Sequence, residues 1–332
     1  MPQKEIDYYV QGVIGRNRLA MAKTITLIES ILPAHQEMAR AVMDQLLPHT
    51  GKAVRLGITG VPGAGKSTFI ESFGMMLTEK GHRVAVLAVD PSSPRTGGSI
   101  LADKTRMEKL SVNERAFIRP SPSGGTLGGV ARKTRETMMI CEAAGYDVIM
   151  VETVGVGQSE VAVASMVDFF LVLMIAGAGD ELQGIKKGVL ELADAIAVNK
   201  ADGDNIDRAK LARQQYETAM HLLSPPSPDW STPVMLCSSL TGDGLAEIWN
   251  AVLKHRKITE EKGDLERKRR EQSRLWMWAL VKEGLEEWFS KNAQVVNLLP
   301  LIEKEVVNGQ ITATSGAARI LSFLQNYSLT IT

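Results

Sequence analysis

The sequence predicts an α/β protein whose core is a mostly parallel sheet with helices on both faces. Short apolar runs alternate with longer amphipathic segments, as strands alternate with helices in such a three-layer domain. The runs are rich in Val and Ile, which is typical of strands buried on both faces. A glycine-rich loop, GVPGAGKST at 60–68, lies between one such run and a segment that could open a helix.

Each apolar run is a candidate strand because it is short and ends at turn-forming or polar residues. In chain order the expected strands are AVRLGIT (53–59), RVAVLAV (83–89), AFIRP (116–120), YDVIMVE (146–152), DFFLVLMI (168–175), DAIAVN (194–199) and TPVMLCSS (232–239). We expect them to form a P-loop domain over residues 51–255.

Helical extensions are expected on both sides of this domain. Residues 1–50 carry apolar residues at mixed three and four spacing, with Pro33 as a break between two helices. Residues 256–332 begin with a charged, strongly helical segment and end with a second amphipathic piece at 313–327. The first segment holds Trp276, Trp278 and Trp288, whose apolar rings could serve a dimer contact or the chain's own core.

Composition bounds the possible partners and compartment. The chain has 332 residues, with 38 Lys plus Arg against 38 Asp plus Glu, so no net field attracts nucleic acid or an anionic membrane. Cys141 and Cys237 stand far apart without metal-ligand spacing, which fits a reducing cytoplasm. The apolar stretch 161–179 is interrupted by Asp168 and followed by glycine, so we expect a helix end and a buried strand rather than a membrane span.

The loop at 60–68 matches the phosphate-binding pattern G-x-x-x-x-G-K-[ST]. Its glycines allow successive backbone N–H groups to point at phosphate oxygens near a helix N-terminus. Lys66 would bridge the β- and γ-phosphates and Ser67 would bind Mg²⁺ through its hydroxyl. The candidate nucleotide-binding residues of this loop are Gly60, Val61, Pro62, Gly63, Ala64, Gly65, Lys66, Ser67 and Thr68.

A second phosphate-side element follows the strand at 146–152. A carboxylate at the end of a strand, Glu152, could hold a Mg²⁺-bound water, and Gly155 lies three residues further on. A glycine N–H that meets the γ-phosphate can sense whether that phosphate is present. We therefore expect a switch at Glu152 and Gly155.

The segment NKAD at 199–202 follows another strand and predicts the base. An Asp carboxylate at Asp202 would accept hydrogen bonds from the two donors on the edge of guanine, whereas adenine offers no such pair and would leave the carboxylate unpaired. Ser238, Ser239 and Leu240 suit the second guanine-contacting loop. With Asn199 and Lys200, these residues predict GTP as the nucleotide.

Two long polar loops remain open to two interpretations each. Residues 90–107 contain Asp90 and Asp103 and could be a first switch near Mg²⁺ or a plain surface loop. Residues 177–188 contain Lys187 and could be a functional loop or the cap of the next helix. From the motifs alone, Lys66 and Glu152 are candidate catalytic residues, and Ser67 and Glu152 are candidate metal ligands.

The glutamine that orients the attacking water in Ras-like GTPases is absent from its usual position. Val156 directly follows the switch glycine, and Gln158 lies two residues further on. Slow hydrolysis without a partner is therefore expected.

Together, GVPGAGKST, VDPSSPRTGGSILADKTRM, CEAAGYDVIMVETVGVGQSE, GDELQGIKKG and NKADGDN closely resemble the MeaB/ArgK-like GTPases, bacterial relatives of the human methylmalonic aciduria type A protein. The resemblance implies a Mg²⁺-dependent GTPase chaperone that gates adenosylcobalamin delivery to methylmalonyl-CoA mutase and protects that enzyme. It also implies a homodimer built through the C-terminal helices and a third switch at 177–188. The same resemblance implies that Asp90 and Asp103 join Ser67 and Glu152 as metal ligands, and that Asp103 and Lys187 join Lys66 and Glu152 as catalytic residues. Isobutyryl-CoA mutase would serve equally well as the partner.

Two other functions are compatible with a P-loop. One is a transport-system kinase that phosphorylates periplasmic amino-acid-binding proteins, although no acceptor motif or separate base is visible. The other is a nickel-insertion GTPase, which would need Cys or His ligands near the switches, whereas the two cysteines are isolated and the five histidines are scattered.

Overall fold

The computed structural model describes residues 3–89, 107–120, 127–153, 158–177, 187–221 and 229–327, except for the side chains of 127, 128, 158, 187 and 323–327. Its strands form one sheet in the order β3-β2-β4-β1-β5-β6-β7, and every neighbouring pair is parallel. The strands are β1 (Val54–Gly60), β2 (Val84–Val89), β3 (Ala116–Arg119), β4 (Val148–Thr153), β5 (Phe169–Ile175), β6 (Ala195–Asn199) and β7 (Val234–Leu236). The predicted fold class is confirmed, and each strand coincides with a predicted apolar run, although β1 and β4 end one residue beyond theirs, at Gly60 and Thr153.

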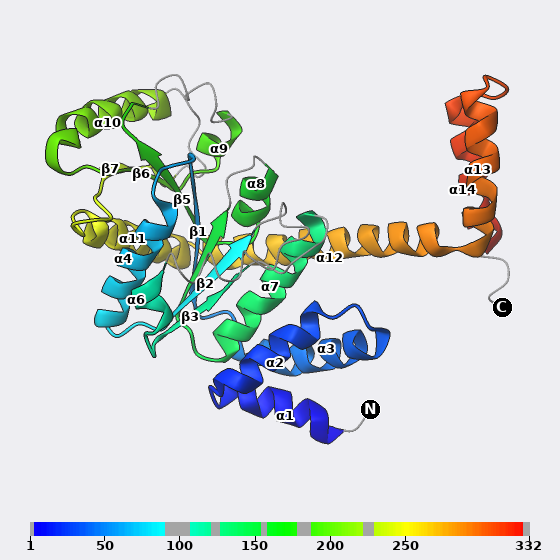
Figure 1. Ribbon diagram of the computed structural model, residues 1–332, viewed down its shortest axis with the longest axis horizontal. Helices are drawn as coiled ribbons and strands as arrows, with labels where there is room; N and C mark the ends of the chain where they lie inside the picture. Colours follow the sequence, from blue (N-terminus) through cyan, green and yellow to red (C-terminus); the bar gives the residue numbers. More distant parts are fainter. Residues whose placement is uncertain are drawn as a thin grey trace. The chain divides into compact units, whose positions relative to one another are not determined.

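Helices cover both faces of the sheet, which is why every residue of β2, β4 and β6 is buried. In Figure 1, α4 (Lys66–Glu79) lies on one side of the strands, and α7 (Leu127–Ala143) and α8 (Gln158–Ala164) lie on the other. The remaining helices of this domain are η1 (Leu47–His49), α6 (Glu108–Ser111), α9 (Lys187–Glu191), η3 (Gly203–Asn205), α10 (Ile206–His221) and α11 (Leu245–Glu261).

The apolar stretch 161–179 contains the end of α8 followed by the buried strand β5, as predicted. Within the described ranges, every helix is too short or too polar to span a bilayer.

The N-terminal extension contains one more helix break than the sequence predicted. Its helices are α1 (Gln3–Ile14), α2 (Arg18–Glu29) and α3 (Pro33–Leu46). Pro33 starts α3, because proline is well tolerated where a helix N–H has no partner. The additional break is stabilised by Asn17, whose side-chain oxygen accepts a hydrogen bond from the Ala20 N–H at 3.0 Å and caps α2.

Helix α2 is tied to β3, the strand at one edge of the sheet. The Arg18 guanidinium donates to the carbonyl of Ala116 at the start of the strand. Arg119 at its end forms an ion pair with Glu29 of α2 at 2.5 Å. These contacts hold α2 to both ends of the edge strand.

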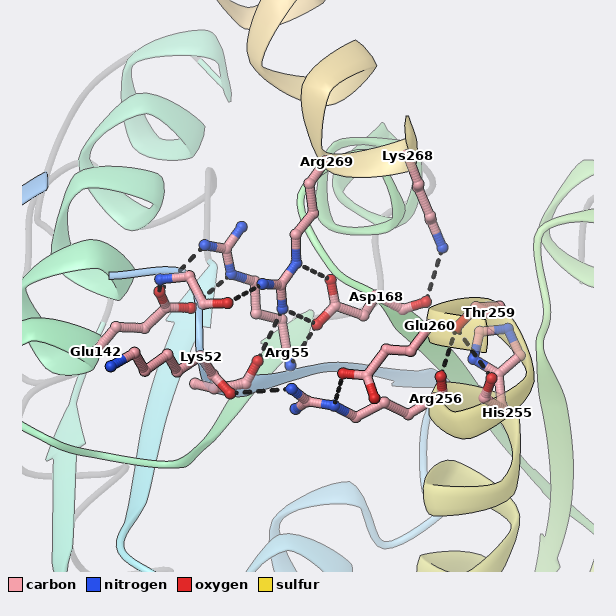
Figure 2. A network of polar contacts seen from close by, with 12 residues as sticks. Lys52, Arg55, Glu142, Asp168, His255, Arg256, Thr259, Glu260, Lys268 and Arg269 are labelled. Atoms are coloured by element: carbon pink, nitrogen blue, oxygen red, sulfur yellow. Dashed lines mark hydrogen bonds and ion pairs between the residues drawn. The ribbon is translucent and has the colours of Figure 1, made fainter. Parts of the chain in front are cut away.

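Asp168, just before β5, is the centre of a buried polar network at the amino ends of the strands (Figure 2). Arg269 donates from Nε to one carboxylate oxygen at 2.8 Å and from a terminal nitrogen to the other at 2.6 Å. The backbone N–H of Arg55 also donates to this carboxylate at 3.0 Å, and Lys268 donates to the Asp168 carbonyl at 2.8 Å. Burial favours the neutral acid, but the hydrogen bond and charge of Arg269 outweigh it and hold the pKa of Asp168 below its ordinary value.

The chain divides into two compact units, Met1–Arg269 and Arg270–Thr332. The second unit contains most of α12 (Asp264–Lys291), together with α13 (Ala293–Val307) and α14 (Ala313–Tyr327). Helices α13 and α14 pack closely, because a Cβ added at Gly316 would lie 2.8 Å from the Val306 side chain. Helix α13 tolerates Pro300 in its interior.

Candidate nucleotide-binding site

The glycine-rich loop connects the end of β1 to the start of α4, the context that a phosphate-binding loop requires. Gly65, the residue before α4, has a left-handed φ of 82° that favours glycine. Gly60 passes so close to β5 that an added Cβ would lie 2.2 Å from the Leu173 carbonyl oxygen. The backbone therefore needs glycine at both positions to form this turn.

Lys66 lies at the first position of α4 and reaches back over the loop. Its Nζ donates to the Gly60 carbonyl at 2.8 Å. Burial lowers the pKa of Lys66 below its ordinary value, and the nearby carboxylates Glu152 and Glu160 oppose that change. The ammonium group is thus held close to the loop and can move to phosphate oxygens over a short distance.

Ser67 and Glu152 meet although they come from different elements. Ser67 follows Lys66 on α4, Glu152 lies near the end of β4, and the serine hydroxyl is 3.5 Å from a carboxylate oxygen. Oxygen ligands of this type fit Mg²⁺, which keeps several waters and uses few protein ligands. The other two predicted metal ligands, Asp90 and Asp103, lie outside the described residues.

The predicted guanine loop is joined directly to the phosphate loop through Asn199 at the end of β6. The Asn199 amide donates to the Ala64 carbonyl at 2.7 Å. Its side-chain oxygen accepts from the Ser239 N–H at 3.0 Å and from the Ser239 hydroxyl at 2.9 Å. Asn199 is 1% exposed, so this joint is shielded from water.

Asp202 and Ser238 are also neighbours, since the buried Ser238 hydroxyl donates to the Asp202 carboxylate. Lys200, between Asn199 and Asp202, has a left-handed φ of 60°, which is uncommon for a residue with a side chain. Strained conformations of this kind cluster at ligand sites. Leu240 is 83% exposed beside this loop.

The structure does not describe the side chains or loops at two predicted functional positions, Gly155 and Lys187. Gly155 lies outside the described residues, as do most of 177–188. Lys187 begins α9, but its side chain is not among those described. The switch assignments at these positions stay predictions.

Two residues that sequence reasoning missed belong to the same region. The Ser72 hydroxyl donates to the Ser239 carbonyl at 2.6 Å and so ties α4, the helix after the phosphate loop, to the predicted guanine loop. Glu160 on α8 is 7% exposed, and its charge acts on Lys66. A carboxylate inside the otherwise apolar run after residue 158 was a signal for Glu160, whereas nothing in the local sequence distinguishes Ser72.

Three features of this parallel sheet define a P-loop GTPase: a phosphate loop after the central strand, a carboxylate on the adjacent strand, and an Asn-Lys-x-Asp loop joined to the phosphate loop. The chain belongs to the MeaB family, described as methylmalonyl Co-A mutase-associated GTPase MeaB, which matches residues 21–294.

Similar proteins span nearly the whole chain. A putative GTPase of Caulobacter vibrioides is 55% identical, with 97% of this chain and 98% of that protein covered. GTPase ArgK of Escherichia coli is 47% identical, with 93% of each covered. The methylmalonic aciduria type A homolog of Mus musculus, a mitochondrial protein, is 44% identical over 96% of this chain and 79% of its own length.

A solved structure of an LAO/AO transport system kinase is also similar. It has a TM-score of 0.79 and 38% identity, with 98% of this chain and 99% of that chain covered. Together with the family match, these relatives show that the chain is a guanine-nucleotide-binding GTPase.

Proposed function

We propose that this GTPase acts as a chaperone that gates adenosylcobalamin delivery to methylmalonyl-CoA mutase, or to a closely related cobalamin mutase, and protects that enzyme. The observation that carries the proposal is membership of a family described by its association with methylmalonyl-CoA mutase. GTP binding and hydrolysis would supply the two states that such a gate needs.

In this proposal the phosphate side of the site performs the hydrolysis. Residues 60–68 bind the phosphates through backbone N–H groups, and Lys66 moves from the Gly60 carbonyl to the β- and γ-phosphates. Ser67 and Glu152 would hold Mg²⁺, and Asp90 and Asp103 would be further ligands. When bound, Mg²⁺ neutralises charge that develops on the phosphate oxygens.

The guanine side of the site selects the base. Asp202 accepts hydrogen bonds from the two guanine donors, and the Ser238 hydroxyl holds its carboxylate in place. Asn199 and Ser239 fix the distance between the base and phosphate positions. Adenine would leave Asp202 without a donor, which penalises ATP.

We further propose that the C-terminal unit forms a homodimer. On α12, Leu275 is 53%, Trp278 is 51% and Leu285 is 58% exposed, and Leu301 on α13 is 62% exposed. Apolar side chains gathered on one helical unit are typical of an interface rather than of a surface that faces water. A second copy of the chain supplies a partner of the same apolar character.

The similarity to a structure described as an LAO/AO transport system kinase favours a second candidate, phosphoryl transfer to a binding protein. The two functions differ in where the γ-phosphate goes. A chaperone releases it to water, whereas a kinase forms a stable bond to a protein acceptor.

The decisive experiment measures GTP turnover with and without purified methylmalonyl-CoA mutase, using γ-labelled GTP and a search for labelled protein. We expect slow basal turnover, on the order of 10⁻⁴ to 10⁻² per second as for unassisted GTPases, and a marked increase with the mutase. Lys187→Ala should abolish the increase while GTP binding persists, and the neighbouring Lys186→Ala serves as the matched control. Stable label on a periplasmic binding protein, with no effect of the mutase, would instead establish the kinase.

A further inference from the structure

The N-terminal helices and α7 line an open, surface-accessible cavity that the nucleotide site does not use. It has a volume of about 860 Å³ and is lined by residues of α1, α2, α3 and α7. These helices pack together beside the sheet (Figure 1). The volume lies within the range of about 300 to 1,000 Å³ that is typical of small-molecule sites.

The lining of the cavity combines aliphatic and aromatic side chains. Leu27 is buried and Met38 is half-buried, and both line the cavity. The rings of Tyr8 and Tyr9 meet edge to face, with centroids 5.4 Å apart. Tyr8 is 49% exposed, so part of its ring is available to stack on a flat group.

The charged groups of the lining favour an anion. Lys4, Lys23 and Lys133 reach the cavity from three different helices. Within the described ranges, Lys4 and Lys133 form no ion pair. The polar contacts of Lys23 in the same ranges are with the Tyr8 hydroxyl, at 3.5 Å, and with the Tyr8 ring.

The acidic groups of the lining do not neutralise these lysines. Glu29 is already paired with Arg119 at 2.5 Å. Glu5 is thus the one lining carboxylate without a cationic partner in the described part of the chain. Three ammonium groups around one cavity would lose mutual repulsion if a polyanion bound among them.

We propose that this cavity binds an organic phosphate with an aromatic ring, a ligand of nucleotide size that is distinct from the GTP held by the phosphate loop. The ring lies against Tyr8, Leu27 and Met38, and the phosphates lie among the three lysines. Lysine binds phosphate as a flexible point charge, so the site accepts several phosphate arrangements.

The test is a calorimetric titration of ADP into the full chain after saturation with GDP. ADP carries a flat ring and two phosphates, and the occupied guanine site cannot take it. We expect saturable binding of one ADP per chain, with weaker binding of inorganic pyrophosphate, which lacks the ring, and of adenosine, which lacks the phosphates. Absence of ADP binding to the GDP-saturated chain would overturn the proposal, and so would pyrophosphate binding as tight as that of ADP.

Variants locate the binding site. Lys23→Ala and Lys133→Ala should each weaken ADP binding about tenfold, as loss of a charge-assisted contact does. Tyr8→Leu, which keeps apolar bulk but removes the ring, should weaken ADP binding without changing pyrophosphate binding. Lys210→Ala, on exposed α10, is the matched control, and GDP affinity reports correct folding of every variant. Equal ADP affinity across all four variants would place the ligand elsewhere and refute the site.

Discussion

Replacing Arg269 by methionine tests whether the buried ion pair in Figure 2 stabilises the first unit. The side chains of Arg269 and Asp168 are 16% and 8% exposed, so water replaces little of the lost interaction. Breaking such a pair by removing one partner costs about 3 to 5 kcal/mol, because the other charge stays buried. Methionine preserves much of the apolar stem of Arg269, so the loss of stability reports mainly the removed charge and its hydrogen bonds.

The two cysteines provide an assay confined to this unit. Cys141 and Cys237 are both buried, and burial raises the pKa of their thiols, that of Cys237 to about 12. Pulse labelling with a methanethiosulfonate reagent across a urea titration therefore reports unfolding of residues 1–269, which contain both. Arg213→Met is the control, because its pair with Glu217 is exposed and should change stability by less than about 1 kcal/mol.

The pH dependence provides an independent check. In the wild-type chain the folded pKa of Asp168 lies below the unfolded value of about 3.9, so its contribution is complete above that pH and is lost as pH falls through the folded pKa. Without Arg269, burial should raise the folded pKa of Asp168. As pH falls, protonation of Asp168 then removes the unpaired buried charge that destabilises the variant. We expect the stability difference to narrow from pH 7 toward about pH 4. Two results would refute the reasoning: a loss of unfolding free energy below about 1 kcal/mol in Arg269→Met at pH 7, or a stability difference from wild type that widens in acid.

Three further predictions follow from the site and its surroundings. Asp202→Asn should shift binding from GTP toward XTP, because the amide can donate to the 2-oxo group of xanthine; unchanged selectivity in a titration would contradict the guanine-loop assignment. Burial is the main cause that lowers the pKa of His255, so the neutral ring stabilises the fold above the unfolded pKa of about 6.5, and this contribution is lost as pH falls through the folded pKa. His255→Phe should therefore make the urea midpoint depend less on pH in that window. An unchanged pH dependence of the midpoint would contradict this prediction. A full chain carrying Trp278→Lys and Leu285→Lys should be a monomer by light scattering, whereas Val112→Lys, at an exposed apolar position of the first unit, should remain a dimer; a dimer in both would exclude this interface.

The sequence predicted the sheet well because each strand is a short apolar run that the chain must bury. Helix boundaries were harder where a polar cap decided them, as at Asn17, since a cap depends on one hydrogen bond rather than on periodicity. Helix α13 was not distinguished, because Pro300 interrupts a pattern that tertiary packing nevertheless holds in a helix.

The candidate site residues could be predicted where they form a contiguous motif with fixed spacing in the sequence. The phosphate loop and the Asn199 to Asp202 segment are contiguous motifs, so their residues could be named in advance. Contacts between distant segments could not, and Asp168 and Arg269 are 101 positions apart without any local pattern that links them. The Ser72 contact with Ser239 was hidden for the same reason, since the two residues are 167 positions apart.

The hydrogen bonds of Asn199 have a consequence for how the nucleotide state is distinguished. They hold the base and phosphate loops at a fixed spacing, so little conformational entropy has to be lost there when a nucleotide binds. GTP and GDP share every group that this rigid joint positions, and a contact of equal strength in both complexes cannot shift an equilibrium between conformations. These hydrogen bonds therefore contribute equally to the binding of GTP and of GDP, and the free energy that separates the two states has to arise from contacts of the terminal phosphate alone.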